Sequence, residues 1–135
     1  MNNGTHKNSA TFVASANLSR GVAVKLTSAD ATKIEACADA DAIGVTLDDV
    51  KAGDIVGVAL LGVANSTLVC KAGEAFAAGS KLCLGSGGVV KKVPAAGAQA
   101  QNVVIIGKAL TPSNADGDTV EIIHHCPRAE TIAAA

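Results

Sequence analysis

The sequence contains no tryptophan and no tyrosine, and it has only two phenylalanines, Phe12 and Phe76. Pockets for small organic ligands are usually lined by aromatic side chains, and proteins that bind single-stranded nucleic acids stack bases on them. This scarcity argues against both kinds of site. Hydrophobic residues still make up 49% of the chain. The core must therefore consist of Val, Ile, Leu and Ala, whose small or branched side chains suit closely packed sheets.

The sequence also lacks an excess of either charge. Its 11 basic and 12 acidic residues give a net charge of -1, which provides no field to attract a phosphate backbone. The longest apolar run, residues 55–64, has about half the length that a membrane-spanning helix needs. We therefore expect neither nucleic acid nor a membrane as a partner.

Features of secreted proteins are missing as well. The first ten residues are polar and lack the apolar segment of a signal peptide. The four cysteines, at positions 37, 70, 83 and 126, form no Cys-x-x-Cys pair. We expect a protein made in the cytoplasm with reduced thiols. Cys70 and Cys83 lie in alternating apolar runs and are expected to be buried.

No group of residues forms a recognisable catalytic, cofactor-binding or metal-binding set. In His124-His125-Cys126, adjacent strand residues point to opposite faces, and a structural zinc site needs four ligands. The acidic residues at 48–49 and 116–118 supply too few oxygens for calcium and are typical of turns. A strand follows the glycines of residues 85–88, whereas a phosphate-binding loop leads into a helix. We expect no enzyme activity, no cofactor and no metal.

What the sequence does contain is a segment that appears twice, at residues 43–58 and 106–122. Each copy has the pattern of a strand, a tight Gly-Asp turn and a second strand. Glycine followed by aspartate is typical of such turns, because glycine tolerates positive φ and aspartate bonds to nearby backbone. The structural turn residues are Gly53, Asp54, Gly117 and Asp118. We interpret both copies as parts of the frame of one closed β domain.

The rest of the chain is predicted as short strands separated by turns. About nine strands and at most one short helical turn, within residues 72–79, fit the pattern. The predicted fold class is all-β, a small compact barrel or sandwich of short antiparallel strands. We divide the chain into a flexible N-terminal arm (1–19), a single β domain (20–126) and a C-terminal tail (127–135) that frays.

Seven short motifs follow one another along the β domain: Ala42–Val45, Gly53-Asp54, Val56–Leu61, Ala72–Gly79, Gly87-Gly88, Ile106-Gly107 and Asp116–Ile123. In this order they resemble the capsid decoration, or cement, proteins of tailed bacteriophages. The resemblance covers roughly residues 20–125.

The resemblance implies a homotrimer on the outer capsid surface of a virion, synthesised in the cytoplasm of a bacterial host. Such a trimer clamps neighbouring subunits of the major capsid protein and stabilises the head. The resemblance also implies an arm that orders on binding and adds to an exposed strand edge of the capsid. Deleting residues 1–18 is then expected to leave the domain folded but weaken attachment. The candidate capsid-binding residues are Thr11, Phe12, Val13, Ala14 and Leu18.

Two other hypotheses remain open. Residues 72–82 resemble a turn of biotinyl and lipoyl carrier domains, which would make the chain a carrier-type or small-ligand-binding β domain. The Met-Lys-Met or Asp-Lys-Ala tripeptide that carries the modification does not occur in this sequence. The chain would alternatively be an enzyme subunit whose chemistry lies on a partner chain.

Overall fold

The computed structural model describes residues 8–135, which fold into ten strands and one short 3-10 helix, η1 (Ser86–Gly88). This confirms the predicted all-β class, although the helical turn lies at η1 and not within residues 72–79. In this part of the chain, no helix has the length and apolar character needed to cross a membrane. The strands are β1 (Ser9–Ala14), β2 (Ala23–Leu26), β3 (Lys33–Ala36), β4 (Gly44–Thr46), β5 (Ile55–Leu60), β6 (Leu68–Lys71), β7 (Lys81–Leu84), β8 (Val90–Lys92), β9 (Gln101–Ala109) and β10 (Thr119–Ile132).

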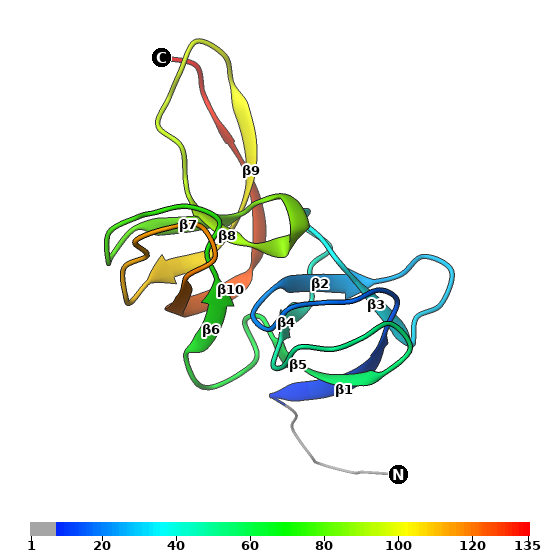
Figure 1. Ribbon diagram of the computed structural model, residues 1–135. Coiled ribbons are helices and arrows are strands. Elements are labelled where there is room, and N and C mark those ends of the chain that lie inside the picture. The colour runs from blue at the N-terminus through cyan, green and yellow to red at the C-terminus, as the bar shows by residue number, and fades with distance from the viewer. Residues whose placement is uncertain (1–7) are drawn as a thin grey trace.

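The first five strands close into a small barrel with the order β1-β3-β2-β4-β5 (Figure 1). β1 completes the barrel, because it pairs antiparallel with β5 from Ser9 to Val13 and parallel with β3 at Val13 and Ala14. Side chains alternate between the two faces of each strand, so one row points inward. The interior cluster contains Ala14, Leu18, Val22, Val24, Ile34, Val56 and Val58.

The last five strands form a second sheet that repeats the topology of the barrel. The strand order of this sheet is β8-β7-β9-β10-β6. Because the barrel is closed, its order can be written from β3 as β3-β2-β4-β5-β1, and the two orders then correspond strand by strand. The two edges of the sheet meet at one parallel bridge between Ala72 and Val90, where the Gly73 N–H donates to the Val90 carbonyl at 2.9 Å. The second sheet is thus an incompletely closed version of the barrel.

The strand registers of the two sheets agree as well. Gly44 lies opposite Leu60 in the barrel, and Gly107 lies opposite His124 in the second sheet. We therefore call residues 9–61 the first half and residues 67–135 the second half. The repeated hairpins, interpreted above as parts of one closed frame, occupy equivalent places in the two halves. Three backbone hydrogen bonds of the first half recur at equivalent places in the second half. In the first half, the N–H groups of Gly21, Leu47 and Gly53 donate to the carbonyls of Thr46, Gly57 and Ala14, respectively. In the second half, the N–H groups of Gly79, Leu110 and Gly117 donate to the carbonyls of Ala109, Glu121 and Ala72, respectively.

β1 corrects the predicted N-terminal arm. The sequence placed residues 1–19 outside the β domain, but residues 9–14 form a barrel strand, and Leu18 bridges to Val50. Phe12 packs against the interior cluster of the barrel. The physical reason is alternation, because apolar residues at positions 10, 12 and 14 of one strand share its inward face. Residues 1–7 of the predicted arm lie outside the described residues.

The predicted C-terminal tail is also part of a strand. β10 continues to Ile132 and pairs with β9 from Arg128 opposite Ile105 to Ile132 opposite Gln101. Pro127, the first residue of the predicted tail, lies in an irregularity between His124 and Arg128. Proline is accommodated at such places because the ladder needs no N–H there.

The paired ends of β9 and β10 project from the rest of the molecule as a two-stranded ribbon (Figure 1). We use the name ribbon for residues 94–105 and 128–135. Its tip is closed by a hydrogen bond of 2.8 Å from the Ala135 N–H to the Gly97 carbonyl. Thr131 Oγ1 donates to Asn102 Oδ1 at 2.9 Å, which links the two strands through their side chains.

The two halves pack on one shared hydrophobic core. The Lys71 N–H donates to the Gly21 carbonyl at 2.8 Å and so ties β6 to the barrel. η1 of the second half lies against β2: Gly88 has a φ of +81°, and a Cβ atom there would stand 2.5 Å from the Ala23 carbonyl oxygen. Glycine is the residue that fits this close approach. The core unites Ala23, Cys37, Ala42, Val45, Ala59 and Leu61 of the first half with Leu68, Cys70, Ala72, Phe76, Leu82, Leu84, Val90, Ile106, Ala109, Val120 and Ile122 of the second.

Candidate functional site

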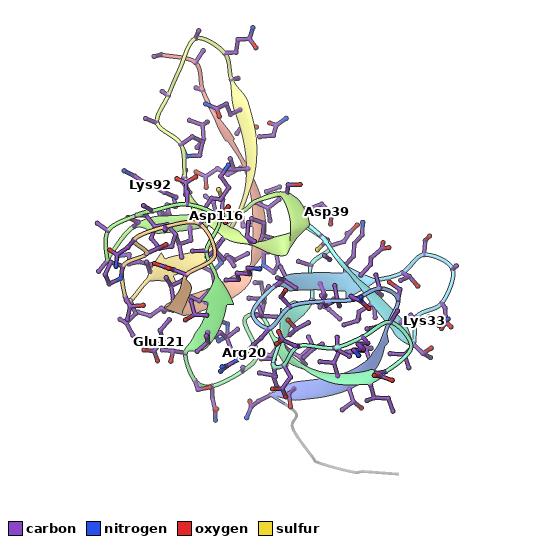
Figure 2. All side chains as sticks on the ribbon, in the orientation of Figure 1. Arg20, Lys33, Asp39, Lys92, Asp116 and Glu121 are labelled. Atoms are coloured by element: carbon purple, nitrogen blue, oxygen red, sulfur yellow. The ribbon has the colours of Figure 1, made fainter. Side chains whose placement is uncertain are left out.

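A shallow groove runs along the junction of the two halves. It encloses about 260 Å³, and its walls include Ser9 of β1, Leu47 after β4, and Val69 of β6. The side chains of Leu47 and Val69 are unusually exposed for large apolar residues, at 43% and 37%. Arg20 lies at the same junction (Figure 2). We call this surface the junction groove.

The sequence-predicted capsid-binding residues divide between the two faces of β1. Ala14 is buried in the barrel with Leu18 nearby, and Phe12 packs against the same cluster, so these three support the barrel. Thr11 is exposed and Val13 half-buried. They alternate with Phe12 and Ala14, so they share the outer face with Ser9, which lines the junction groove. Only Thr11 and Val13 of the predicted set therefore lie on the outer face of β1, and none of the five residues lines the groove itself.

One backbone edge of β1 is incompletely paired. β5 pairs with β1 from Ser9 to Val13, whereas β3 pairs only with Val13 and Ala14. On the β3 side, the backbone of residues 9–12 therefore has no strand partner within the described chain. An unpaired strand edge is a template for a strand from another chain.

The two Gly-Asp turns lie at equivalent places, before β5 and before β10. Gly53 and Gly117 have φ of +88° and +93°, and no other group lies within 4 Å of where a Cβ atom would be. The Asp118 carboxylate accepts hydrogen bonds from the backbone N–H groups of Asn114 and Ala115, at 2.7 and 3.2 Å. These contacts fix the turn before β10, and they involve no group outside it.

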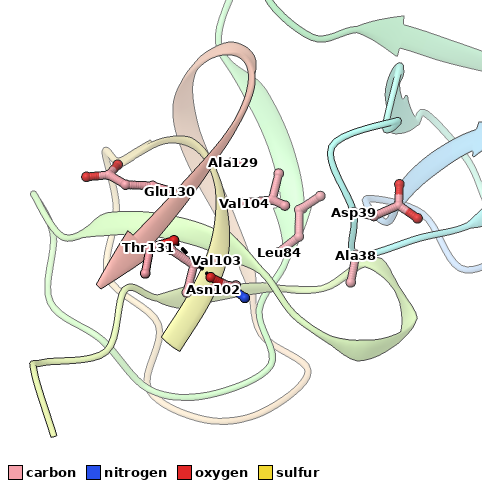
Figure 3. Close-up of a pocket in the computed structure, with 9 residues that line it drawn as sticks. All are labelled: Ala38, Asp39, Leu84, Asn102, Val103, Val104, Ala129, Glu130 and Thr131. Carbon is pink, nitrogen blue, oxygen red and sulfur yellow. Dashed lines mark hydrogen bonds between the residues drawn. The ribbon is translucent and has the colours of Figure 1, made fainter. Parts of the chain in front are cut away.

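A hollow of about 390 Å³ lies beside the base of the ribbon (Figure 3). Leu84 of β7 and Val104 of β9 lie between the ribbon and the loop that carries Ala38 and Asp39. Asp39 Oδ2 lies 2.8 Å from Lys25 Nζ. The hydrogen bond from Lys25, with a further one from the Asp41 N–H, holds the pKa of Asp39 below its ordinary value. The carboxylate at the rim of the hollow therefore stays ionised.

The histidines and cysteines of the described chain were candidates for a metal centre. Within residues 8–135, no three or more His, Cys, Asp or Glu side chains are arranged to hold a metal ion. Both ring nitrogens of His124 instead contact backbone groups, of Gly62 and Ser66. Cys70 and Cys83 are buried, as expected from their apolar surroundings. Burial raises the pKa of the Cys70 thiol to about 12.

A comparison with protein families identifies the chain. Residues 4–124 match the family model of the phage cement proteins. The chain belongs to this family. It is accordingly a phage structural protein that associates with the capsid, and the resemblance seen in the sequence is confirmed. Residues 125–135, which include the outer part of β10, lie beyond the matched stretch.

A solved structure has the same fold as this cement protein. It is the crystal structure of the head fiber gp8.5 N base of bacteriophage phi29, with a TM-score of 0.65 and 20% sequence identity. The alignment covers 90% of the cement protein and 97% of the phi29 chain. At this level of identity the likeness extends to the fold. Among curated protein sequences, none matches significantly.

Sequence reasoning missed the junction groove and the ribbon. The groove joins residues far apart in the chain, such as Ser9, Leu47 and Val69, and no local pattern places them together. The ribbon did leave a signal. Residues 93–107 contain no charged side chain, which is a long interval for a segment that starts in an exposed loop.

Proposed function

We propose that this cement protein binds the outer surface of a phage head as a homotrimer and stabilises the head. In this proposal it clamps neighbouring subunits of the major capsid protein. The observation that carries the proposal is the family match over residues 4–124. The fold shared with the N base of a phage head fiber supports the same location.

The junction groove is the proposed contact surface for the major capsid protein. Leu47 and Val69 provide exposed apolar area, and Arg20 lies beside them. Arginine is enriched in protein interfaces, and the buried centre of an interface is more apolar than the rest of the surface. The uncovered β1 edge adjoins this surface and can accept an extended capsid segment by strand addition. Thr11 and Val13 then supply side chains on the outer face, while Phe12, Ala14 and Leu18 hold the strand in place.

Trimer formation allows a small contact area on each subunit to be sufficient for stable binding to the head. A single groove of this size offers limited area, and standard stable interfaces bury roughly 1,200–2,000 Å² in total. Three linked grooves bind together, because the second and third contacts form at a high effective concentration once the first exists. Subunits that are each held by a different chain of one trimer resist separation. This is the proposed origin of head stabilisation.

The decisive experiment mixes purified protein with undecorated heads. We expect the protein to sediment with the heads and to raise their resistance to heat and to chelating agents. Leu47→Asp places a charge in the junction groove and is expected to weaken head binding at least about tenfold, as for a central interface residue. Leu26→Asp is the matched control, since Leu26 is exposed to a similar degree, 39%, and is not part of the groove.

Two results would refute these proposals. Failure of the unmodified protein to bind heads, or binding without any gain in head stability, contradicts the proposed function. Equal head binding by the Leu47→Asp and Leu26→Asp variants contradicts the location at the junction groove. Circular dichroism of both variants establishes that each remains folded.

A further inference from the structure

The ribbon has two open strand edges. β7 pairs with β9 only from Lys108 to Ile105, and β6 pairs with β10 only up to Ile122. Within the described chain, no third strand borders β9 before Ile105 or β10 after Ile122. A two-stranded hairpin is marginally stable by itself in water. A ribbon of this kind is therefore expected to be covered by another molecule.

The composition of the ribbon tip is that of an interface. Residues 94–102 and 131–135 carry no charged side chain, and most of them are alanine, glycine or other small residues. Charged residues are depleted in the centre of interfaces because each costs desolvation energy. Small side chains also allow another backbone to approach closely. The nearest charges on the ribbon are Arg128 and Glu130, at its base.

The internal repeat indicates what covers the ribbon. In the first half, the segments before β4 and after β5 contribute Cys37, Ala42 and Leu61 to the contact with the second half. By the matched registers, the equivalent segments of the second half are the part of β9 before Gly107 and the part of β10 after His124. These two segments are the ribbon and its base. At the base of the ribbon, Val104 packs on the core shared with the first half, but beyond the base no further strand of the described chain pairs with the ribbon.

We infer that the ribbon forms the seam between molecules of this cement protein: it packs against the ribbon base of a second molecule. The uncharged tip of one molecule lies in the hollow that Leu84, Val104 and the Ala38–Asp39 loop form in the next. Such a contact joins two different surfaces and closes into a ring when the rotation between molecules permits. The inference rests on the proposed self-association and assigns it a surface distinct from the junction groove.

The test measures association in the absence of heads. The full-length protein is studied over a concentration series by sedimentation velocity and light scattering. Ala96→Asp/Ala98→Asp places two charges on the exposed tip and is expected to raise the concentration for half-association at least about tenfold. The control, Ala31→Asp/Ala52→Asp, places the same charges on exposed loops of the first half and is expected to associate like the unmodified protein.

Hydrogen exchange of the unmodified protein provides a second measurement that needs no variant. Amides on the open edges of the ribbon, in residues 101–104 and 128–132, are expected to gain protection as the protein concentration rises. Unchanged association of the tip variant, or ribbon protection that is independent of concentration, would overturn the seam. A protein that stays monomeric at all concentrations would overturn it too. Loss of head binding with unchanged association would place the ribbon against the capsid instead, which also contradicts the inference.

These outcomes separate the seam from the proposed function. If the tip variant no longer associates but the unmodified protein fails to stabilise heads, the seam stands and the proposed function fails. If the unmodified protein stabilises heads while the tip variant associates normally, the proposed function stands and the seam fails.

Discussion

The backbone N–H of Gly62 donates a hydrogen bond of 2.9 Å to Nδ1 of His124. Because Nδ1 accepts this bond, the proton of the neutral ring lies on Nε2, which donates to the Ser66 carbonyl at 2.9 Å. One imidazole on β10 thus holds both ends of the connection between the two halves. Its neighbour His125 contacts only the carbonyl of Cys126.

Replacing His124 with alanine is expected to loosen this connection. Both backbone partners lose a hydrogen bond, and the expected loss in the free energy of unfolding is about 1–2 kcal/mol. His125→Ala is the control and should change stability by less than about 0.5 kcal/mol, as for most exposed positions. Urea unfolding of both variants measures the difference. Equal stabilities would show that the imidazole does not hold the connection.

The contact between η1 and β2 is tested by two neighbouring glycines. Gly87 and Gly88 have φ of +80° and +81°, so alanine at either position is strained by about 1 kcal/mol. At Gly87 the space for a Cβ atom is open, whereas at Gly88 it is filled by the Ala23 backbone. We expect Gly88→Ala to be clearly more destabilising than Gly87→Ala. Thermal unfolding of the two variants gives the comparison, and similar melting temperatures would contradict the tight packing of the halves.

Stability is expected to fall at alkaline pH. Burial raises the pKa of Cys70 to about 12 and that of Cys37 to about 11, from an ordinary value of 9.0. Above pH 9.0 the unfolded chain releases these protons while the folded chain retains them, so unfolding becomes more favourable as the pH rises toward 11 and 12. Below pH 9.0 both states keep the thiols neutral and the effect vanishes.

Cys70→Val keeps a small apolar side chain at this position and removes the titrating group. Urea unfolding between neutral and alkaline pH should therefore show a shallower loss of stability for this variant than for the unmodified protein. Identical pH profiles would indicate that other groups cause the alkaline loss.

The structure changes the expected effect of deleting residues 1–18, which the sequence alone predicts to leave the domain folded. Deleting residues 1–18 removes β1 and with it the closing strand of the barrel, so we expect loss of the folded first half. Deleting residues 1–7 is the matched control, because it retains β1. Circular dichroism and thermal unfolding compare the two truncations. A cooperative, native-like melt of the longer truncation would show that β1 is dispensable for folding.

The sequence was sufficient for the fold class because hydrophobic alternation and Gly-Asp turns are local signals. The strand residues around Gly44 and Gly107 were recognised in this way. Ala10, Phe12 and Ala14 alternate as in a strand, but the polar residues before them are typical of a flexible arm, and the partners of β1 come from distant segments of the chain. The Ala-rich residues 127–135 are typical of a fraying tail, and their continuation as part of β10 depends on pairing with β9, which leaves no local pattern.

The candidate surfaces were less accessible to sequence reasoning. Leu47 becomes exposed and Leu61 buried through the way the two halves pack, and neither outcome follows from its neighbours in the chain. The repeated hairpin can be recognised in the sequence, but how far the structural repeat extends follows only from the strand order. Only the agreement between β3-β2-β4-β5-β1 and β8-β7-β9-β10-β6 shows that the repetition extends over a whole half.

Because each chain contains the same topology twice, the proposed trimer would contain six related β modules. The particle would have threefold symmetry, with twice as many related β modules as subunits. Alternate modules would carry a ribbon and the others would not. A particle built in this way would present three junction grooves and three ribbons, so each pair of modules would supply one contact to the capsid and one contact to a neighbouring subunit.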